Sequence, residues 1–205
     1  AHLRLAPIQC VSAGVPMTTG IDTMDYYISS CWFEPQNAQE NYSETLVCLN
    51  DLMVNMYPPK QNKPLKTRTE LGLPEDKNLY IFPHTLIRVD PELDNIFAEI
   101  LKQDPKAIIY LVQDLKNGLH THIQERFKQK HPNLVQRIEF LPWMNQADFL
   151  NVIACCNVAL DSLRLGGGNV TFQSFYVGTP MIQFPTRLLR CRIARGIGTT
   201  WHVGH

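Results

Sequence analysis

Apolar residues change their spacing repeatedly from Leu79 to the end of the chain. Short apolar runs, typical of buried strands, alternate with stretches in which apolar residues recur every three or four positions, as on one face of a helix. The predicted strands cover residues 79–82, 107–112, 138–141, 158–161 and 181–184, and helices are predicted to begin near residues 91, 120, 146, 169 and 188. This alternation predicts an α/β fold, with a Rossmann-like parallel sheet covered by helices on both faces.

The N-terminal part of the chain follows a different pattern. Strands are predicted at 5–12, 24–30 and 42–49, with a loop at 14–20, and the stretch from Tyr57 to Thr69 is rich in proline and basic residues. We expect residues 1–55 to end one domain, residues 56–69 to form a connector, and residues 70–205 to form most of a second domain. Since the N-terminal elements are too few to close a core, the chain is expected to be a fragment of a larger enzyme.

Composition narrows the class of protein. Nineteen basic and nineteen acidic residues cancel, so the net charge favours neither nucleic acid nor an anionic membrane. No apolar run is long enough to cross a bilayer, and the N-terminus does not resemble a signal peptide. The six cysteines form no CxxC pair, which favours reduced thiols over disulfides or a zinc site. We therefore expect a cytoplasmic protein that binds no nucleic acid, membrane or metal.

A glycine triplet carries the first sign of chemistry. Gly166, Gly167 and Gly168 join the predicted strand at 158–161 to the helix that begins at Asn169. Glycines let a ligand approach the backbone, and the first amides of a helix attract a phosphate. The segment lacks the Lys and Ser/Thr of a P-loop and the spacing of a dinucleotide turn. A loop without a ligand remains an alternative, and Asn169 is also a favoured helix cap.

Ligands of parallel sheets bind beyond the carboxyl ends of the strands. Four stretches meet that condition and are expected to line one crevice: His84–Arg88, Gln113–Lys116, Pro142–Gln146 and Ser162–Asn169.

Five segments, in this order, resemble the catalytic region of glycosyltransferase family 41. They read LAPIQCVSAGVPMTTG from Leu5, MDYYIS from Met24, YSETL from Tyr42, GLPED from Gly72 and GGGNVTFQSFYVGTP from Gly166. That family contains the protein O-GlcNAc transferases, and the chain is similar to bacterial relatives that carry tetratricopeptide repeats. The resemblance covers nearly the whole chain.

The resemblance implies a GT-B fold, with a partial N-terminal Rossmann-like domain and a C-terminal domain that binds the nucleotide sugar. It implies an inverting enzyme that transfers a sugar from a UDP-sugar, UDP-GlcNAc in most members, to Ser or Thr hydroxyls of a protein acceptor. Neither a metal nor another cofactor is expected. The start of the N-terminal catalytic domain, with the family's catalytic-domain histidines, and the repeats would lie outside this chain, so the fragment alone is expected to be inactive and its catalytic base is unknown.

The same resemblance assigns site residues. Arg88 lies where the family usually has a lysine that contacts the diphosphate, so it is expected to stabilise the leaving group. The residues expected to bind the nucleotide are His84, Thr85, Met144, Phe149, Gly167, Gly168, Asn169, Val170 and Gln173. Thr18, Thr19 and Gly20 match a loop that faces the cleft from the N-terminal domain.

Four positions depart from the family pattern. Relatives usually have Trp and His or Tyr where this chain has Ala13 and Val15, a lysine at Arg88 and an acid at Gln173. These departures motivate an alternative, a non-catalytic module that binds a nucleotide sugar or a partner. A nucleotide-sugar epimerase with a similar fold is a third interpretation.

Overall fold

The computed structural model describes residues 2–54, 56–57, 65–114 and 118–204, and the chain divides into two compact units. The first unit comprises Ala1–Tyr57, Arg164–Gly168 and Phe184–His205. The second unit comprises Pro58–Leu163 and Asn169–Gln183. The last segment of the chain thus belongs to the same compact unit as the N-terminal segment. Residues 58–64, half of the predicted connector at 56–69, lie outside the described residues.

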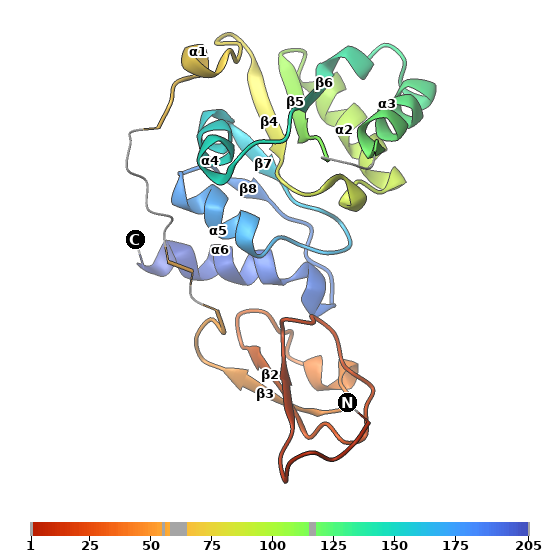
Figure 1. Cartoon of the computed structure of the whole chain (residues 1–205), viewed down its shortest axis with the longest axis vertical. Helices are drawn as coiled ribbons and strands as arrows, with labels where there is room; N and C mark the ends of the chain where they lie inside the picture. Colours follow the sequence, from red (N-terminus) through yellow and green to blue (C-terminus); the bar gives the residue numbers. More distant parts are fainter. Residues whose placement is uncertain (1, 55, 58–64, 115–117, 205) are drawn as a thin grey trace. The chain divides into compact units, whose positions relative to one another are not determined.

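A five-stranded sheet forms the centre of the second unit (Figure 1). Its strands are β4 (Asn78–Phe82), β5 (Ala107–Val112), β6 (Ile138–Leu141), β7 (Val158–Leu160) and β8 (Met181–Ile182), and their order is β6-β5-β4-β7-β8. Every adjacent pair runs parallel, which confirms the predicted α/β class. Since β5, β4 and β7 are neighbours and run parallel, the residues that follow these three strands emerge at one edge of the sheet.

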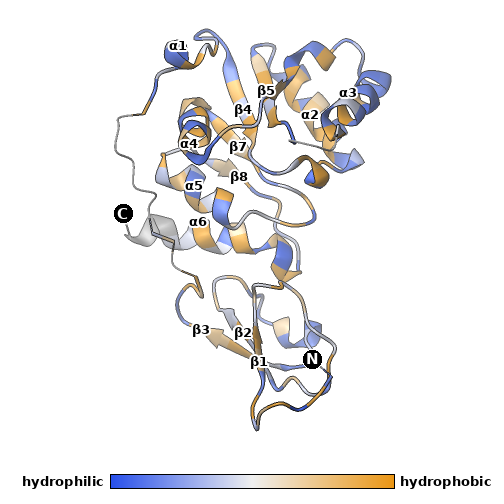
Figure 2. Ribbon diagram, in the orientation of Figure 1, coloured by the Kyte–Doolittle hydropathy of each residue, from blue (hydrophilic) through white to orange (hydrophobic). Residues whose placement is uncertain are grey.

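Helices cover both faces of this sheet because both faces are apolar (Figure 2). On one face, α2 (Pro91–Gln103) and α3 (Leu119–Lys130) bury Phe97 and Phe127 against Phe82 and the apolar side of β5. On the other face, α4 (Gln146–Cys155) packs Ile153 against β4, and α5 (Asn169–Tyr176) lies beside α4.

Local signals explain where several helices begin and end. Pro91 occupies the first turn of α2, and the Asp90 side chain accepts from the amide of Glu92. The short α1 (Arg68–Leu71) has a capping box, while η2 (Leu86–Arg88) and η3 (Val135–Arg137) are single 3-10 turns. Gly178 follows α5 with a φ of 83°, a conformation that glycine adopts without strain.

The first unit contains a parallel sheet of order β1-β2-β3, formed by Cys10–Ser12, Tyr26–Ser30 and Thr45–Leu49. The predicted strand at 5–12 is too long, since only its last three residues pair. The preceding backbone is held by the Gln9 side chain, whose amide nitrogen donates to the carbonyl of Leu3 and whose oxygen accepts from the amide of Leu5. Three helical segments complete the unit: η1 (Ala38–Asn41), η4 (Leu189–Cys191) and α6 (Ile193–Gly204).

The last helix packs closely on the segment after β2. A Cβ atom added at Gly196 would lie 2.2 Å from Cδ1 of Phe33 and 2.8 Å from the carbonyl oxygen of Trp32. The Nε atom of Arg192 donates to the carbonyl of Phe33 at 2.6 Å. Gly196 therefore permits a helix-to-backbone approach that a larger residue would prevent.

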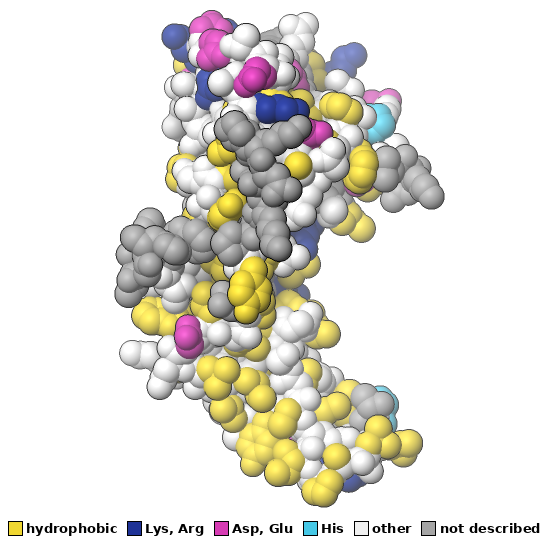
Figure 3. Space-filling view, turned by 60° about the vertical axis from the view of Figure 1, so that its left-hand side comes forward, with side chains coloured by type: hydrophobic (Ala, Val, Ile, Leu, Met, Phe, Trp, Pro, Cys, Tyr) yellow, Lys and Arg dark blue, Asp and Glu magenta, His cyan; other side chains and the backbone are white. Residues whose placement is uncertain are grey.

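Exposed apolar side chains are frequent on the first unit, and the space-filling view shows such side chains in yellow (Figure 3). Leu3, Leu5 and Ile8 are each more than 60% accessible. Val47 and Leu49 on β3 are also exposed. Within the described part of the chain, no helix combines the length and apolarity needed to cross a membrane.

Candidate functional site

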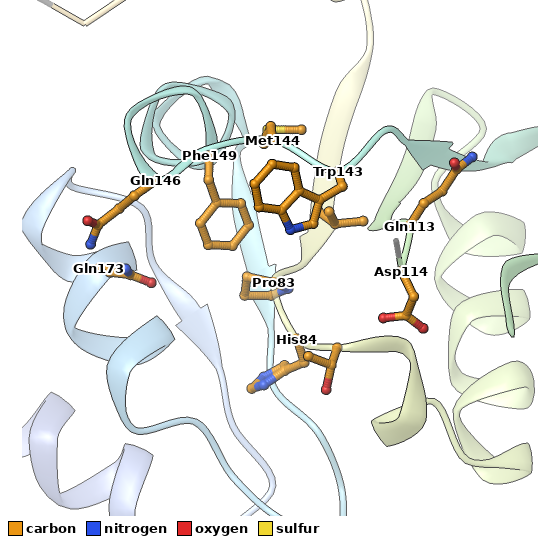
Figure 4. Close-up of a pocket in the computed structure, with 11 residues that line it drawn as sticks. Pro83, His84, Gln113, Asp114, Trp143, Met144, Gln146, Phe149 and Gln173 are labelled. Atoms are coloured by element: carbon orange, nitrogen blue, oxygen red, sulfur yellow. The ribbon is translucent and has the colours of Figure 1, made fainter. Parts of the chain in front are cut away.

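A pocket of about 500 Å³ opens in the second unit beyond the carboxyl ends of β4, β5 and β6 (Figure 4). Pro83, His84 and Thr85 follow β4, while Val112, Gln113 and Asp114 end or follow β5. The remaining wall comprises residues after β6 and on α4 and α5: Trp143, Met144, Gln146, Phe149 and Gln173. Three of the four stretches expected to share a crevice thus contribute to one pocket.

One wall of the pocket is apolar. The rings of Trp143 and Phe149 lie on the same side, above Pro83, with Met144 beside them (Figure 4). Trp143 is 56% exposed, which leaves its indole accessible. Flat apolar surfaces of this kind stack well on a heteroaromatic base.

The other walls carry polar groups. Gln146 and Gln173 project from the neighbouring helices α4 and α5, whereas Asp114 lies across the pocket from them (Figure 4). The Oδ2 atom of Asp114 is buried and has no hydrogen-bond partner among the described residues. Amide and carboxylate oxygens can accept hydrogen bonds from hydroxyl groups such as those of a ribose or a hexose.

His84 connects the pocket to two charged residues. Its Nε2 atom lies 2.9 Å from Oδ1 of Asp161, which follows β7, and both side chains are almost fully buried. Its Nδ1 atom lies 3.3 Å from a guanidinium nitrogen of Arg88, at the end of η2. Arg88 does not itself line the pocket but contacts it through His84.

The glycine loop belongs to the first unit, whereas the helix that follows it belongs to the second. The amide of Gly166 donates to the carbonyl of Arg190 at 2.8 Å, and both Gly166 and Gly167 are buried. Asn169 is exposed at the start of α5, and the carbonyl of Val170 accepts from the Ser174 hydroxyl. The role assigned to Gly167, Gly168, Asn169 and Val170 stays a prediction.

The loop with Thr18, Thr19 and Gly20 is tied to a buried carboxylate. The Thr18 hydroxyl donates to Glu44 at 2.7 Å, and both the amide and the hydroxyl of Thr19 donate to the other carboxylate oxygen. Burial raises the pKa of Glu44, but the hydrogen bonds from Thr19 and Thr18 outweigh it and lower the pKa to about 2. Gly20 adopts a φ of 63°.

Several lining residues were not named as site residues from the sequence. Trp143 and Gln146 lie in a stretch that the strand-end rule had selected, as do Gln113 and Asp114. The signal that could have singled them out was the residue type, an aromatic ring or a carboxylate placed shortly after a buried strand.

Among the positions that depart from the family pattern, Val15 has a structural contact: its backbone carbonyl accepts a hydrogen bond from the Tyr27 hydroxyl at 2.7 Å.

The pattern of glycosyl transferase family 41 matches residues 58–203, most of the chain. The chain belongs to this family. It is 28% identical to the probable UDP-N-acetylglucosamine–peptide N-acetylglucosaminyltransferase SEC of Arabidopsis thaliana, over 99% of this chain and 21% of that protein. It is 26% identical to the SPINDLY protein of Solanum lycopersicum, which has the same enzyme name, over 87% of this chain and 19% of that protein. The chain thus spans only about a fifth of these relatives.

Solved structures agree on the fold. A mutant O-GlcNAc transferase of Thermobaculum terrenum superposes with a TM-score of 0.80 at 22% identity, over 97% of this chain and 37% of that one. WaaG, a glycosyltransferase involved in lipopolysaccharide biosynthesis, gives a TM-score of 0.55 at 15% identity, over 90% of this chain and 49% of that one. The family 41 chain therefore has a fold of the GT-B type, as the sequence resemblance implied.

Proposed function

We propose that this chain binds the nucleotide-sugar donor of a protein O-glycosyltransferase, with UDP-GlcNAc as the donor and Ser or Thr hydroxyls of a protein as the acceptors. The observation that carries the proposal is the pocket at the carboxyl edge of the sheet, which combines stacking rings with hydrogen-bonding groups in a member of family 41. Relatives named as UDP-N-acetylglucosamine–peptide transferases support the choice of donor.

In this proposal the uracil stacks on the wall formed by Trp143 and Phe149, and Gln173 accepts from the ribose hydroxyls. Arg88, next to His84, interacts with the diphosphate. The acceptor oxygen forms a bond to the anomeric carbon as the bond from that carbon to UDP breaks, and the hydroxyl proton passes to a general base supplied by the rest of the enzyme. Arg88 stabilises the negative charge that develops on the leaving diphosphate, so no metal is needed for that step.

Calorimetric titration of the chain with UDP and UDP-GlcNAc tests the proposal. We expect both to bind, and we expect Arg88→Ala to weaken both by about tenfold or more, because a charge-assisted hydrogen bond to phosphate is lost. Lys128→Ala, which removes an exposed cation from α3, is the matched control and should leave the affinity unchanged. Absence of binding, or equal losses in the two variants, would contradict the assigned site.

A non-catalytic nucleotide-binding module is the second candidate. It is favoured by Gln173, which lines the pocket but lacks the charge of the acid that relatives usually carry there. Binding of UDP by the chain without hydrolysis or transfer by the full-length protein would support this candidate over the transferase.

A further inference from the structure

Two buried side chains meet at the carboxyl edge of the sheet. His84 follows β4 and Asp161 follows β7, and these neighbouring strands pair in parallel from Tyr80↔Val158 to Ile81↔Ala159. The side chains of His84 and Asp161 are only 1% and 2% exposed. Burying a carboxylate is costly unless polar partners compensate, and Oδ1 of Asp161 also accepts from the amide of Ser162 at 2.8 Å.

The partners of His84 determine which ring nitrogen carries the proton. A guanidinium only donates hydrogen bonds, so the Nδ1 atom that faces Arg88 at 3.3 Å must be the unprotonated acceptor. The proton of the neutral ring then resides on Nε2, 2.9 Å from Oδ1 of Asp161, although this N–H is not aligned for a straight hydrogen bond. A proton on Nδ1 would instead face the N–H donor of Arg88, and it would leave Nε2 as an acceptor opposite the carboxylate of Asp161.

The arrangement restrains Arg88. The residue lies at the end of the three-residue η2 and is half-buried, and an arginine side chain has several rotatable bonds. A contact from one guanidinium nitrogen to a buried ring limits where the planar group can lie. His84, in turn, is held between the carboxylate and the guanidinium. The Asp161 carboxylate thus contacts the His84 imidazole, which contacts the Arg88 guanidinium.

We propose that Asp161 and His84 are positioning residues for Arg88, which hold the guanidinium beside His84, a residue of the pocket wall, where it can meet a diphosphate. Asp161 faces the protonated Nε2 atom of His84 and favours this tautomer, and the unprotonated Nδ1 atom holds Arg88. The choice of a diphosphate as the ligand rests on the proposed function, but the contact between His84 and Arg88 does not. An arginine restrained in this way loses less conformational entropy when it binds a phosphate.

The ring nitrogens give a test that needs no nucleotide. The ¹⁵N chemical shifts of His84, measured in the free chain at neutral pH, should show Nδ1 unprotonated and Nε2 protonated. Arg88→Ala should move the Nδ1 resonance towards that of a free imidazole. A protonated Nδ1, or an Nδ1 resonance that does not respond to Arg88→Ala, would overturn the positioning contact even if UDP binds.

Titration with UDP tests the consequence for binding. His84→Leu should weaken UDP by about tenfold, whereas His84→Asn should recover most of the affinity, because an amide can donate towards Asp161 and accept from Arg88. His122→Leu, at an exposed position of α3, is the control for loss of an imidazole.

A double-mutant cycle separates positioning from direct contact. In an Arg88→Ala background, His84→Leu should cost no further affinity, since the residue through which it acts is absent. An equal loss in both backgrounds would show that His84 acts independently of Arg88 and would overturn the proposal. If the unmodified chain does not bind UDP, the proposed function fails, and the ring-nitrogen measurement still decides the positioning contact.

Discussion

Arg126 binds Asp94 through two parallel hydrogen bonds of 2.8 Å, from Nε to Oδ2 and from Nη2 to Oδ1. The carboxylate of Asp94 is 1% exposed, and Lys130 reaches it at 3.2 Å from a more exposed position. The pair joins α2 to α3 on one face of the sheet, and the same guanidinium also donates to the carbonyl of Val89.

Removal of this carboxylate should destabilise the second unit. We expect Asp94→Ala to lower the free energy of unfolding by about 3–5 kcal/mol, because Arg126 would keep a partly buried charge without its partner. Lys130→Ala should cost less than about 1 kcal/mol, since the lysine side chain is 40% exposed and water screens its charge. Urea denaturation of the variants measures both values. Similar losses in the two variants would show that burial does not strengthen the Arg126 contact.

Glu44 should make the first unit sensitive to acid. Its folded pKa of about 2 lies below the ordinary value of 4.5, so its ionised form stabilises the fold above about pH 4.5. This contribution should decline as the pH falls from 4.5 towards 2, by roughly 2–3 kcal/mol in total.

Hydrogen exchange of the peptides that cover β2 and β3 measures this dependence. We expect Glu44→Gln to be less stable than the unmodified chain at pH 7 and to show a flatter response to acid. Glu40→Gln, an exposed glutamate in η1, is the control. A response to acid that is the same in the chain and in Glu44→Gln would contradict the assignment.

Gly196→Ala should destabilise the first unit despite the better helix propensity of alanine. The added methyl group would overlap the Phe33 ring and approach the Trp32 carbonyl, at a cost of about 1–3 kcal/mol. The gain in helix propensity is at most about 1 kcal/mol. Gly14→Ala is the matched control, because a Cβ there meets nothing within 4 Å. Thermal unfolding should show a lower midpoint for Gly196→Ala only, and equal midpoints would argue against close packing of α6.

Gln173→Glu should strengthen UDP binding by roughly threefold to tenfold if Gln173 faces the ribose, since a carboxylate accepts from two hydroxyl groups more strongly than an amide does. Gln124→Glu, on the exposed side of α3, controls for the added charge. Titration with UDP and 2′-deoxy-UDP measures the effect, and the gain should be smaller for the deoxy ligand. A loss with both ligands would place the diphosphate, rather than the ribose, beside Gln173.

Chelation should not change UDP binding. The proposal assigns the charge of the diphosphate to Arg88, so titration in EDTA should give the same affinity as titration with Mg²⁺. A large gain with Mg²⁺ would show that a cation contributes to the site.

The sequence predicts the central strands of the second unit well because they are buried on both faces, whereas the predicted strand at 181–184 pairs only at Met181 and Ile182, where Ile182 is exposed. Residues 107–112 form β5 as predicted, since all six are apolar and bounded by polar residues. β1 was predicted less well. Apolar residues such as Leu5 and Ile8 look like part of a strand, but they are exposed, and the Gln9 side chain holds the backbone there.

The site was predictable to the level of the stretches that line it, since the strand-end rule depends only on the order of elements. Contacts between distant residues were not predictable. The position of Asp161 against His84 depends on β4 and β7 being neighbours, although β5 and β6 lie between them in the sequence. The bond of Thr18 to Glu44 likewise joins two loops whose approach no local pattern shows.

The contact between Gly196 and Phe33 has a consequence for biosynthesis. A ribosome makes the β1-β2-β3 segment long before it makes α6. The surface around Phe33 therefore stays exposed while the residues between β3 and α6 are synthesised. The first unit therefore closes only after the residues of the second unit have been made, and the apolar surface that α6 covers stays exposed during that interval.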